Sequence, residues 1–223
     1  MNILVWLSRN YGIDMKNIPI ADIERELEKF TCDLLRICRL TQEAINKTSC
    51  VLLCSDVFKM QEIIDHSKRI GALCVAFEEY LDDILTWYRP EGSVLKLISS
   101  SINVIIELKQ IADLTVGIAE SLLNFNADIP ERYKINIAQC AKNYKNIVWD
   151  STISFLRQDA ELAKKTIVAS LELKKICSRM QEGVIEANKT VESAKRDESI
   201  VLFIIQSVGD ISDHAVAIAR SVI

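Results

Sequence analysis

The sequence predicts an all-α protein of two tandem antiparallel three-helix bundles, made of six long helices in the manner of spectrin-like repeats. Apolar residues recur at helical spacing along most of the chain, and no stretch shows the strict alternation of a strand. The 223 residues include only six Gly and three Pro, so turns are few and the elements must be long. Residues 111–119 return at 211–219 with five identical positions. This repeat indicates an internal duplication.

The duplication divides the chain into an N-terminal extension at 1–20, a first bundle at 21–126 and a second bundle at 127–223. The apolar run at 3–7 has no basic residue before it and no small-residue cleavage site, so it does not resemble a signal peptide. It is also too short to cross a bilayer, which needs about 20 apolar residues. Charged residues interrupt the other apolar stretches. We therefore expect a soluble, cytoplasmic protein.

The first two helices have clear boundary signals. The first extends from residue 21 to about residue 54, with Asp22 as its N-cap. The second begins after Asp56, which offers the next cap, and ends near Tyr88, because the residue before Pro90 disfavours the α region. The apolar positions predicted to face the core are Ile23, Leu27, Phe30, Leu34, Ile37, Thr41, Ala44 and Ile45 in the first helix, and Phe58, Ile63, Ile70, Leu73, Phe77, Leu81, Ile84 and Leu85 in the second.

The remaining four helices follow the same plan. The third starts at Ser93 and ends where residues 124–128 interrupt it. Pro130 suits the first turn of the fourth, Asp159 lies near the start of the fifth, and the sixth follows Asn188. The periodic core positions are Leu97, Val104, Leu108, Ile111, Thr115, Ile118 and Leu122; Ile135, Ala138, Tyr144, Ile147, Val148 and Phe155; Leu162, Ile167, Leu171, Ile176 and Met180; and Ile200, Ile204, Val208, Ile211, Ala215, Ile218 and Val222.

Composition argues against several classes of function. A net charge of −4 offers no basic field for nucleic-acid phosphates, so we expect no nucleic-acid partner. The sequence has only two His and shows neither a nucleophile motif nor a Gly-rich phosphate loop, so it contains no recognisable set of catalytic residues. We therefore expect that the protein is not an enzyme. The seven Cys lack CxxC spacing and favour buried packing in a reducing compartment. Cys50, Cys54 and His66 leave a metal site open, although core packing is the simpler interpretation.

The residues around the two repeats resemble the PhoU family. Pro90–Ile98 and Glu107–Asp113 are similar to the family's third helix, 208–219 is similar to its sixth, and 158–163 resembles the opening of its fifth. The resemblance covers about residues 22–223. It implies a cytoplasmic regulator of phosphate uptake that contacts the ATPase of a phosphate ABC transporter and a phosphate-sensing histidine kinase. Such a protein reaches the membrane only through these partners.

The resemblance also implies metal chemistry, because PhoU bundles can bind multinuclear iron or zinc clusters through E/D-x-x-x-D pairs on two helices of each repeat. Carboxylates four residues apart share a helix face and supply hard oxygen ligands. Here most of these positions are replaced, by Ser67, Gly71, Lys109, Ser170, Lys174 and Gly209. We therefore expect no resident cofactor. Fe, Zn or Mg could still bind at Asp113, Asp213, His214 and Asp210. The simpler interpretation of Asp113 is an ion pair with Lys109, and that of the other three residues is a solvated helix end.

A dense acidic face late in the second helix is the candidate partner-binding site. It consists of Glu78, Glu79, Asp82 and Asp83, which form two like-charged i, i+4 pairs. A basic partner surface or a cation would offset this repulsion, and a solvated helix face is the alternative. Wide apolar stripes on long bundles also favour a homodimer. Control of another ion transporter and metal storage remain alternative functions.

Overall fold

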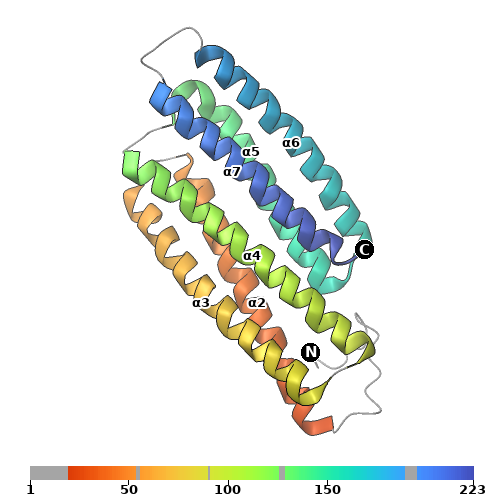
Figure 1. Cartoon of the computed structure of the whole chain (residues 1–223). Coiled ribbons are helices and arrows are strands. Elements are labelled where there is room, and N and C mark those ends of the chain that lie inside the picture. The colour runs from red at the N-terminus through yellow and green to blue at the C-terminus, as the bar shows by residue number, and fades with distance from the viewer. Residues whose placement is uncertain (1–19, 54–55, 90, 126–128, 189–194) are drawn as a thin grey trace.

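The computed structural model describes residues 20–53, 56–89, 91–125, 129–188 and 195–223. Within these ranges it contains six helices and no strand. The helices are α2 (Ile20–Val51), α3 (Val57–Tyr88), α4 (Gly92–Phe125), α5 (Glu131–Arg157), α6 (Ala160–Asn188) and α7 (Lys195–Arg220). The predicted all-α fold of two antiparallel three-helix bundles is confirmed, and Figure 1 shows them side by side in an elongated molecule. The extension before residue 20 and the predicted boundary at residue 126 lie outside the described residues.

The two bundles pack against each other mainly through α4 and α7, with a smaller contact between α2 and α5. Each central helix therefore contacts the two helices of its own bundle and its counterpart in the other. A helix covered on several sides can be apolar around most of its circumference. This explains why Glu198–Arg220 is long and apolar enough to span a bilayer, where the sequence predicted no such segment. Because 56% of its most apolar stretch is buried inside the protein, this segment has the character of a core helix.

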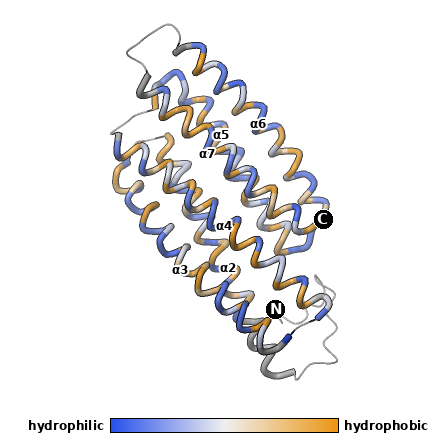
Figure 2. Tube along the Cα trace, viewed as in Figure 1, coloured by the Kyte–Doolittle hydropathy of each residue, from blue (hydrophilic) through white to orange (hydrophobic). Residues whose placement is uncertain are grey.

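The core follows the predicted pattern most closely in α4 and α7. All seven positions predicted for α4 are buried, as are the first six predicted for α7. Figure 2 shows hydrophobic and hydrophilic residues alternating along the labelled helices, as expected where each helix has one covered face. At the centre, Tyr144 is fully buried, and its hydroxyl lies 3.0 Å from the hydroxyl of Ser49 on α2. This hydrogen bond links the two bundles.

Three predicted core positions are wrong. Phe58 and Ile135 are 86% and 82% exposed, and Leu171 is also exposed. Phe58 and Ile135 lie in the first two turns of α3 and α5, two residues before the buried Met60 and Ile137, and therefore on the opposite side of each helix. In α6 the buried stripe instead consists of Ala163, Thr166, Ser170, Leu173, Cys177 and Val184. Most side chains of this stripe are small or polar, so the hydrophobic pattern of the sequence instead selected the larger apolar residues next to it.

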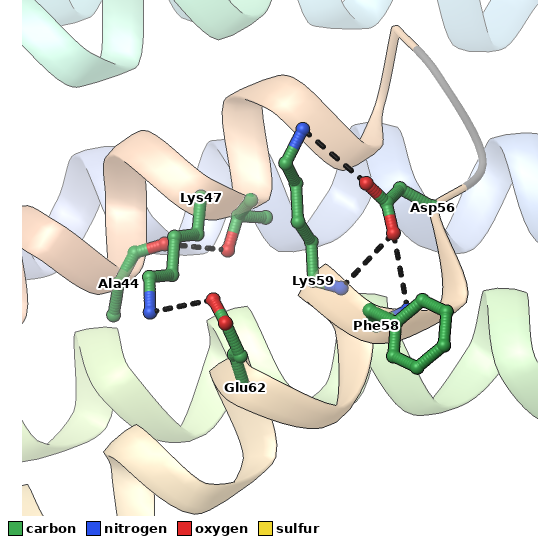
Figure 3. A network of polar contacts seen from close by, with 7 residues as sticks. Ala44, Lys47, Asp56, Phe58, Lys59 and Glu62 are labelled. Atoms are coloured by element: carbon green, nitrogen blue, oxygen red, sulfur yellow. Dashed lines mark hydrogen bonds and ion pairs between the residues drawn. The ribbon is translucent and has the colours of Figure 1, made fainter.

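Helix caps agree with the sequence at two places. Asp56 is the N-cap of α3 and accepts hydrogen bonds from the backbone N–H groups of Phe58 and Lys59 at 3.1 and 3.3 Å (Figure 3). Asp159 likewise accepts a bond from the backbone N–H of Leu162 at 2.9 Å. Both carboxylates satisfy N–H groups that the helix itself leaves unpaired. An ion pair of 2.9 Å between Lys47 and Glu62 then joins α2 to α3 beside the first of these caps (Figure 3).

Other boundaries differ from the prediction. Helix α2 begins at Ile20, so Asp22 lies within its first turn and is not its N-cap, and it ends at Val51 rather than near residue 54. Helix α4 begins one residue early, at Gly92, whose φ of +60° suits a residue without a side chain. It then continues to Phe125, because one polar residue near its end does not terminate a helix packed on its neighbours.

Candidate functional site

The duplicated aspartates lie at equivalent places in the two bundles. Asp113 is exposed on α4 beside α3, and Asp213 is exposed on α7 beside α6. The buried Ser67 hydroxyl on α3 donates a hydrogen bond of 3.4 Å to Oδ1 of Asp113. Asp213 forms an ion pair with the ammonium of Lys174 on α6. The sequence correctly identified these helix pairs as neighbours, since Ser67 and Lys174 occupy motif positions on the facing helices.

Each bundle has four positions that correspond to the E/D-x-x-x-D pairs, and in each bundle one of the four is an aspartate and one is a lysine. The first bundle has Ser67 and Gly71 on α3 with Lys109 and Asp113 on α4, and the second has Ser170 and Lys174 on α6 with Gly209 and Asp213 on α7. Lysine and glycine have therefore exchanged helices between the two bundles. A Cβ atom at either glycine would have no neighbour within 4 Å, so close packing does not require glycine at these positions.

These residues do not fit the multinuclear metal cluster that the resemblance implies. Such a cluster needs several carboxylates, because hard divalent cations take many oxygen ligands. Here the second bundle presents one carboxylate that is already neutralised by Lys174. Among the described residues, no group of three or more His, Cys, Asp or Glu side chains could hold a metal ion. The protein's own ammonium thus occupies the place of a cation in the second bundle.

The two remaining metal candidates have other partners. His214 Nδ1 lies 2.7 Å from Oε2 of Glu107, and both side chains are half-buried between α7 and α4. Asp210 Oδ1 accepts a hydrogen bond of 2.8 Å from the side chain of Gln206, one turn earlier on the same helix. His214 therefore joins the two bundles and is not gathered with Asp210 and Asp213 around one point. Sequence reasoning missed the role of Glu107, because the facing register of α4 and α7 is a tertiary feature.

The acidic face is intact on the outer helix α3. Glu79, Asp82 and Asp83 are exposed, and Glu78 is half-buried. Burial and, secondly, the carboxylate of Glu78 raise the pKa of Cys74 to about 12, which places Glu78 on the side nearer the core. Within the described part of the chain, none of the four acids has a hydrogen-bond or ion-pair partner. This face is therefore free to meet a basic surface.

The cysteines divide into two groups. Cys38, Cys74, Cys140 and Cys177 are buried as predicted, whereas Cys32 and Cys50 are exposed. Cys54 lies outside the described residues, so the structure does not place the Cys50, Cys54 and His66 group. The exposed cysteines lie on the outer side of α2, where the apolar pattern does not distinguish a small thiol at the surface from one in the core.

Comparison with known sequences identifies relatives over most of the chain. Residues 34–122 match the model of the PhoU domain. A phosphate-specific transport system accessory protein PhoU homolog of Aquifex aeolicus is 31% identical over 143 residues, which are 64% of this chain and 65% of that protein. The chain thus matches slightly less than two thirds of this relative's length. A homolog of the same description from Pseudomonas putida is 25% identical over 208 residues, covering 89% of this chain and 78% of that protein.

Two crystal structures share the fold along nearly their whole length. PhoU from Pseudomonas aeruginosa superimposes with a TM-score of 0.86 at 21% identity, covering 90% of this chain and 97% of that one. The phosphate transport system regulatory protein PhoU from Streptococcus pneumoniae gives 0.80 at 20% identity, covering 89% and 94%. These two likenesses concern the fold alone. Together with the matched domain and the sequence relatives, they show that the chain is similar to PhoU proteins in both sequence and fold.

Proposed function

We propose that this chain is an accessory regulator of phosphate uptake and phosphate homeostasis that acts by protein–protein contact and not by catalysis. The observation that carries the proposal is its similarity to two relatives that are accessory proteins of phosphate-specific transport systems. The long helical surface supports it, since α3 and α6 are outer helices and each has one exposed side that is available to partners. We place this activity in the cytoplasm, where the regulatory parts of a transporter and a sensor kinase meet.

The proposed partners are the ATPase of a phosphate ABC transporter and a phosphate-sensing histidine kinase. We assign the exposed acids Glu79, Asp82 and Asp83 of α3 to a basic patch on one of them. Three exposed carboxylates on one helix face attract such a patch over a distance set by ionic screening. Association should therefore slow as the salt concentration rises, while charge reversal on this face should weaken it.

A matched pair of variants tests the partner surface. Glu79→Lys/Asp83→Lys reverses two exposed carboxylates on α3, four residues apart. Glu182→Lys/Glu186→Lys makes the same change in net charge on α6, also four residues apart and exposed. With the purified transporter ATPase and the kinase in an interferometry assay, we expect the α3 variant to weaken binding about tenfold or more and the α6 variant to stay within about twofold.

The outcomes separate the parts of the proposal. Equal weakening by both variants would show that net charge, not the α3 face, drives binding. If the unaltered protein binds neither the ATPase nor the kinase, the regulatory proposal itself is wrong. Binding to the regulatory subunit of a different ion transporter would then favour the alternative function of controlling that transporter.

We also propose that the protein is a homodimer. The chain has a mass of 25.2 kDa, and several large apolar side chains are exposed along its helices, including Leu35 and Trp149. Burying such side chains in a symmetric interface is a common way to cover them. Multi-angle light scattering should give about twice the chain mass. A monomer at every concentration tested would contradict this part of the proposal.

A further inference from the structure

Three sulfur atoms meet between α5 and α6 in the second bundle. Sγ of Cys140 on α5 lies 3.5 Å from Sδ of Met180 on α6. The Cys177 thiol is near enough to raise the pKa of the Cys140 thiol. Cys177 and Met180 are three residues apart and therefore share one face of α6. Both cysteines are more than nine-tenths buried, so the group is enclosed by the bundle.

A surface hollow leads to this group. It has a volume of about 470 Å³ and is lined by residues of α5 and α6, including Arg132, Tyr133, Arg179 and Met180. Met180 is half-buried and belongs both to the wall of the hollow and to the sulfur group. Met180 therefore connects the wall of the hollow with the buried thiol of Cys140.

We propose that Cys140, Cys177 and Met180 form a binding site for the soft monovalent ion Cu(I). Thiolate and thioether sulfurs are the ligands that select Cu(I), whereas Mg²⁺ and Ca²⁺ require oxygen. A structural zinc site takes four ligands, and this group offers three. The ligand number and type therefore favour a soft ion of low coordination number.

The binding step conserves charge and oxidation state. Both thiols lose a proton to solvent, their sulfurs bond to Cu(I), and the thioether contributes a lone pair. The nearby Cys177 thiol and burial raise the pKa of Cys140 above its usual range, so the thiol is protonated at neutral pH and metal binding must release this proton. Two thiolates and one Cu(I) leave a net negative charge. Arg179 is exposed, lines the adjoining hollow and can offset this charge, whereas Arg132 beside it already pairs with Glu198.

The first bundle contains an internal comparison. Cys38 on α2 and Cys74 on α3 are buried on the corresponding helices, and burial is the main cause that raises the pKa of Cys38 to about 12, with a smaller contribution from Cys74. Three residues after Cys74 stands Phe77, where the second bundle has Met180 after Cys177. The first pair therefore lacks the third sulfur. It shows the same burial of thiols without a complete ligand set.

The test is an anaerobic titration of Cu(I) against a colorimetric Cu(I) chelator. It uses the full chain with Cys32, Cys50 and Cys54 replaced by Ser, so that no thiol other than those of the two buried cysteine pairs competes for Cu(I). We expect one Cu(I) per chain with only sulfur neighbours in X-ray absorption. Met180→Leu, which nearly conserves volume, should weaken binding about tenfold or more, and Cys177→Ser should weaken it further. Cys38→Ser/Cys74→Ser is the matched control and should leave binding unchanged.

Circular dichroism of each variant verifies that the helices are intact. If Cys177→Ser unfolds, Met180→Leu alone still decides the matter. No uptake of Cu(I) by the parent chain, unchanged affinity in Met180→Leu, or loss of binding in the Cys38 and Cys74 control would each overturn the proposal. The copper site is independent of the proposed phosphate role, since its test uses no transporter or kinase.

Discussion

Glu198, near the start of α7, is a buried carboxylate whose only described side-chain partner comes from another helix. Its side chain is 1% exposed, and Oε1 lies 2.9 Å from Nη2 of Arg132 on α5, while Oε2 has no hydrogen-bond partner among the described residues. Arg132→Ala therefore removes the one counter-ion of this buried charge that the described residues provide. At 2.9 Å and an effective dielectric constant of about 20, the attraction that is lost amounts to about 6 kcal/mol.

The net cost should be smaller than this attraction. Arg132 is 54% exposed, so water screens the pair and replaces part of the interaction. Removing one partner of a fully buried pair costs about 3–5 kcal/mol. We therefore expect Arg132→Ala to lower the free energy of unfolding by about 2–3 kcal/mol, which corresponds to about 5–10 °C in Tm for a chain of this length.

Urea and thermal unfolding followed by circular dichroism measure this effect. Lys134→Ala is the control, because Lys134 pairs with the exposed Glu131 on the same helix and its loss should cost less than about 0.5 kcal/mol. In a Glu198→Gln background, Arg132→Ala should cost less than about 1 kcal/mol, since no buried charge remains. If Arg132→Ala costs the same in both backgrounds, its effect does not come from Glu198 and the reasoning is refuted.

Three further predictions concern the core, a helix cap and the metal content. Tyr144→Phe should cost about 1 kcal/mol in urea unfolding, because it removes the buried hydrogen bond to Ser49; a cost below about 0.3 kcal/mol would contradict this role. The backbone N–H of Lys59 lowers the pKa of Asp56, so the cap stabilises the protein above the ordinary carboxyl pKa of about 3.9 and is lost as pH falls through the lowered value. The difference in Tm between Asp56→Ala and the unaltered protein should accordingly be present at pH 7 and vanish near pH 2. Elemental analysis of purified protein should give well below one Fe or Zn per chain, and a stoichiometric content would show that the lysine-bearing sites still take metal.

Hydrophobic periodicity predicted the fold well where large apolar residues form the covered stripe of a helix. Helices α4 and α7 meet this condition, because they lie in the centre and bury Ile, Leu and Val side chains. Helix α6 does not, since small residues such as Ala163 and Ser170 fill its narrow contact. The prediction for Phe58 also failed, because an apolar residue in the first turn of a helix can lie on the exposed side, as Phe58 does opposite the buried Met60.

The candidate site was predictable only within each bundle. The family resemblance placed Ser67 and Lys174 at motif positions on the helices that neighbour Asp113 and Asp213, and the structure brings each pair into contact. The contact of His214 with Glu107 depends on how α4 and α7 are aligned between bundles. The sulfur group likewise depends on the facing register of α5 and α6. Such registers are decided by packing of the whole core and leave no local mark in the sequence.

Because lysine stands on α6 in the second bundle, the positive charge beside Asp213 belongs to the protein itself and not to a bound metal ion. A bound metal ion is occupied according to its free concentration, and a chelator can remove it. Lys174 is covalently attached, so the contact between α6 and α7 at Asp213 has the same composition in metal-poor and metal-rich cells. Metal starvation therefore does not loosen this contact.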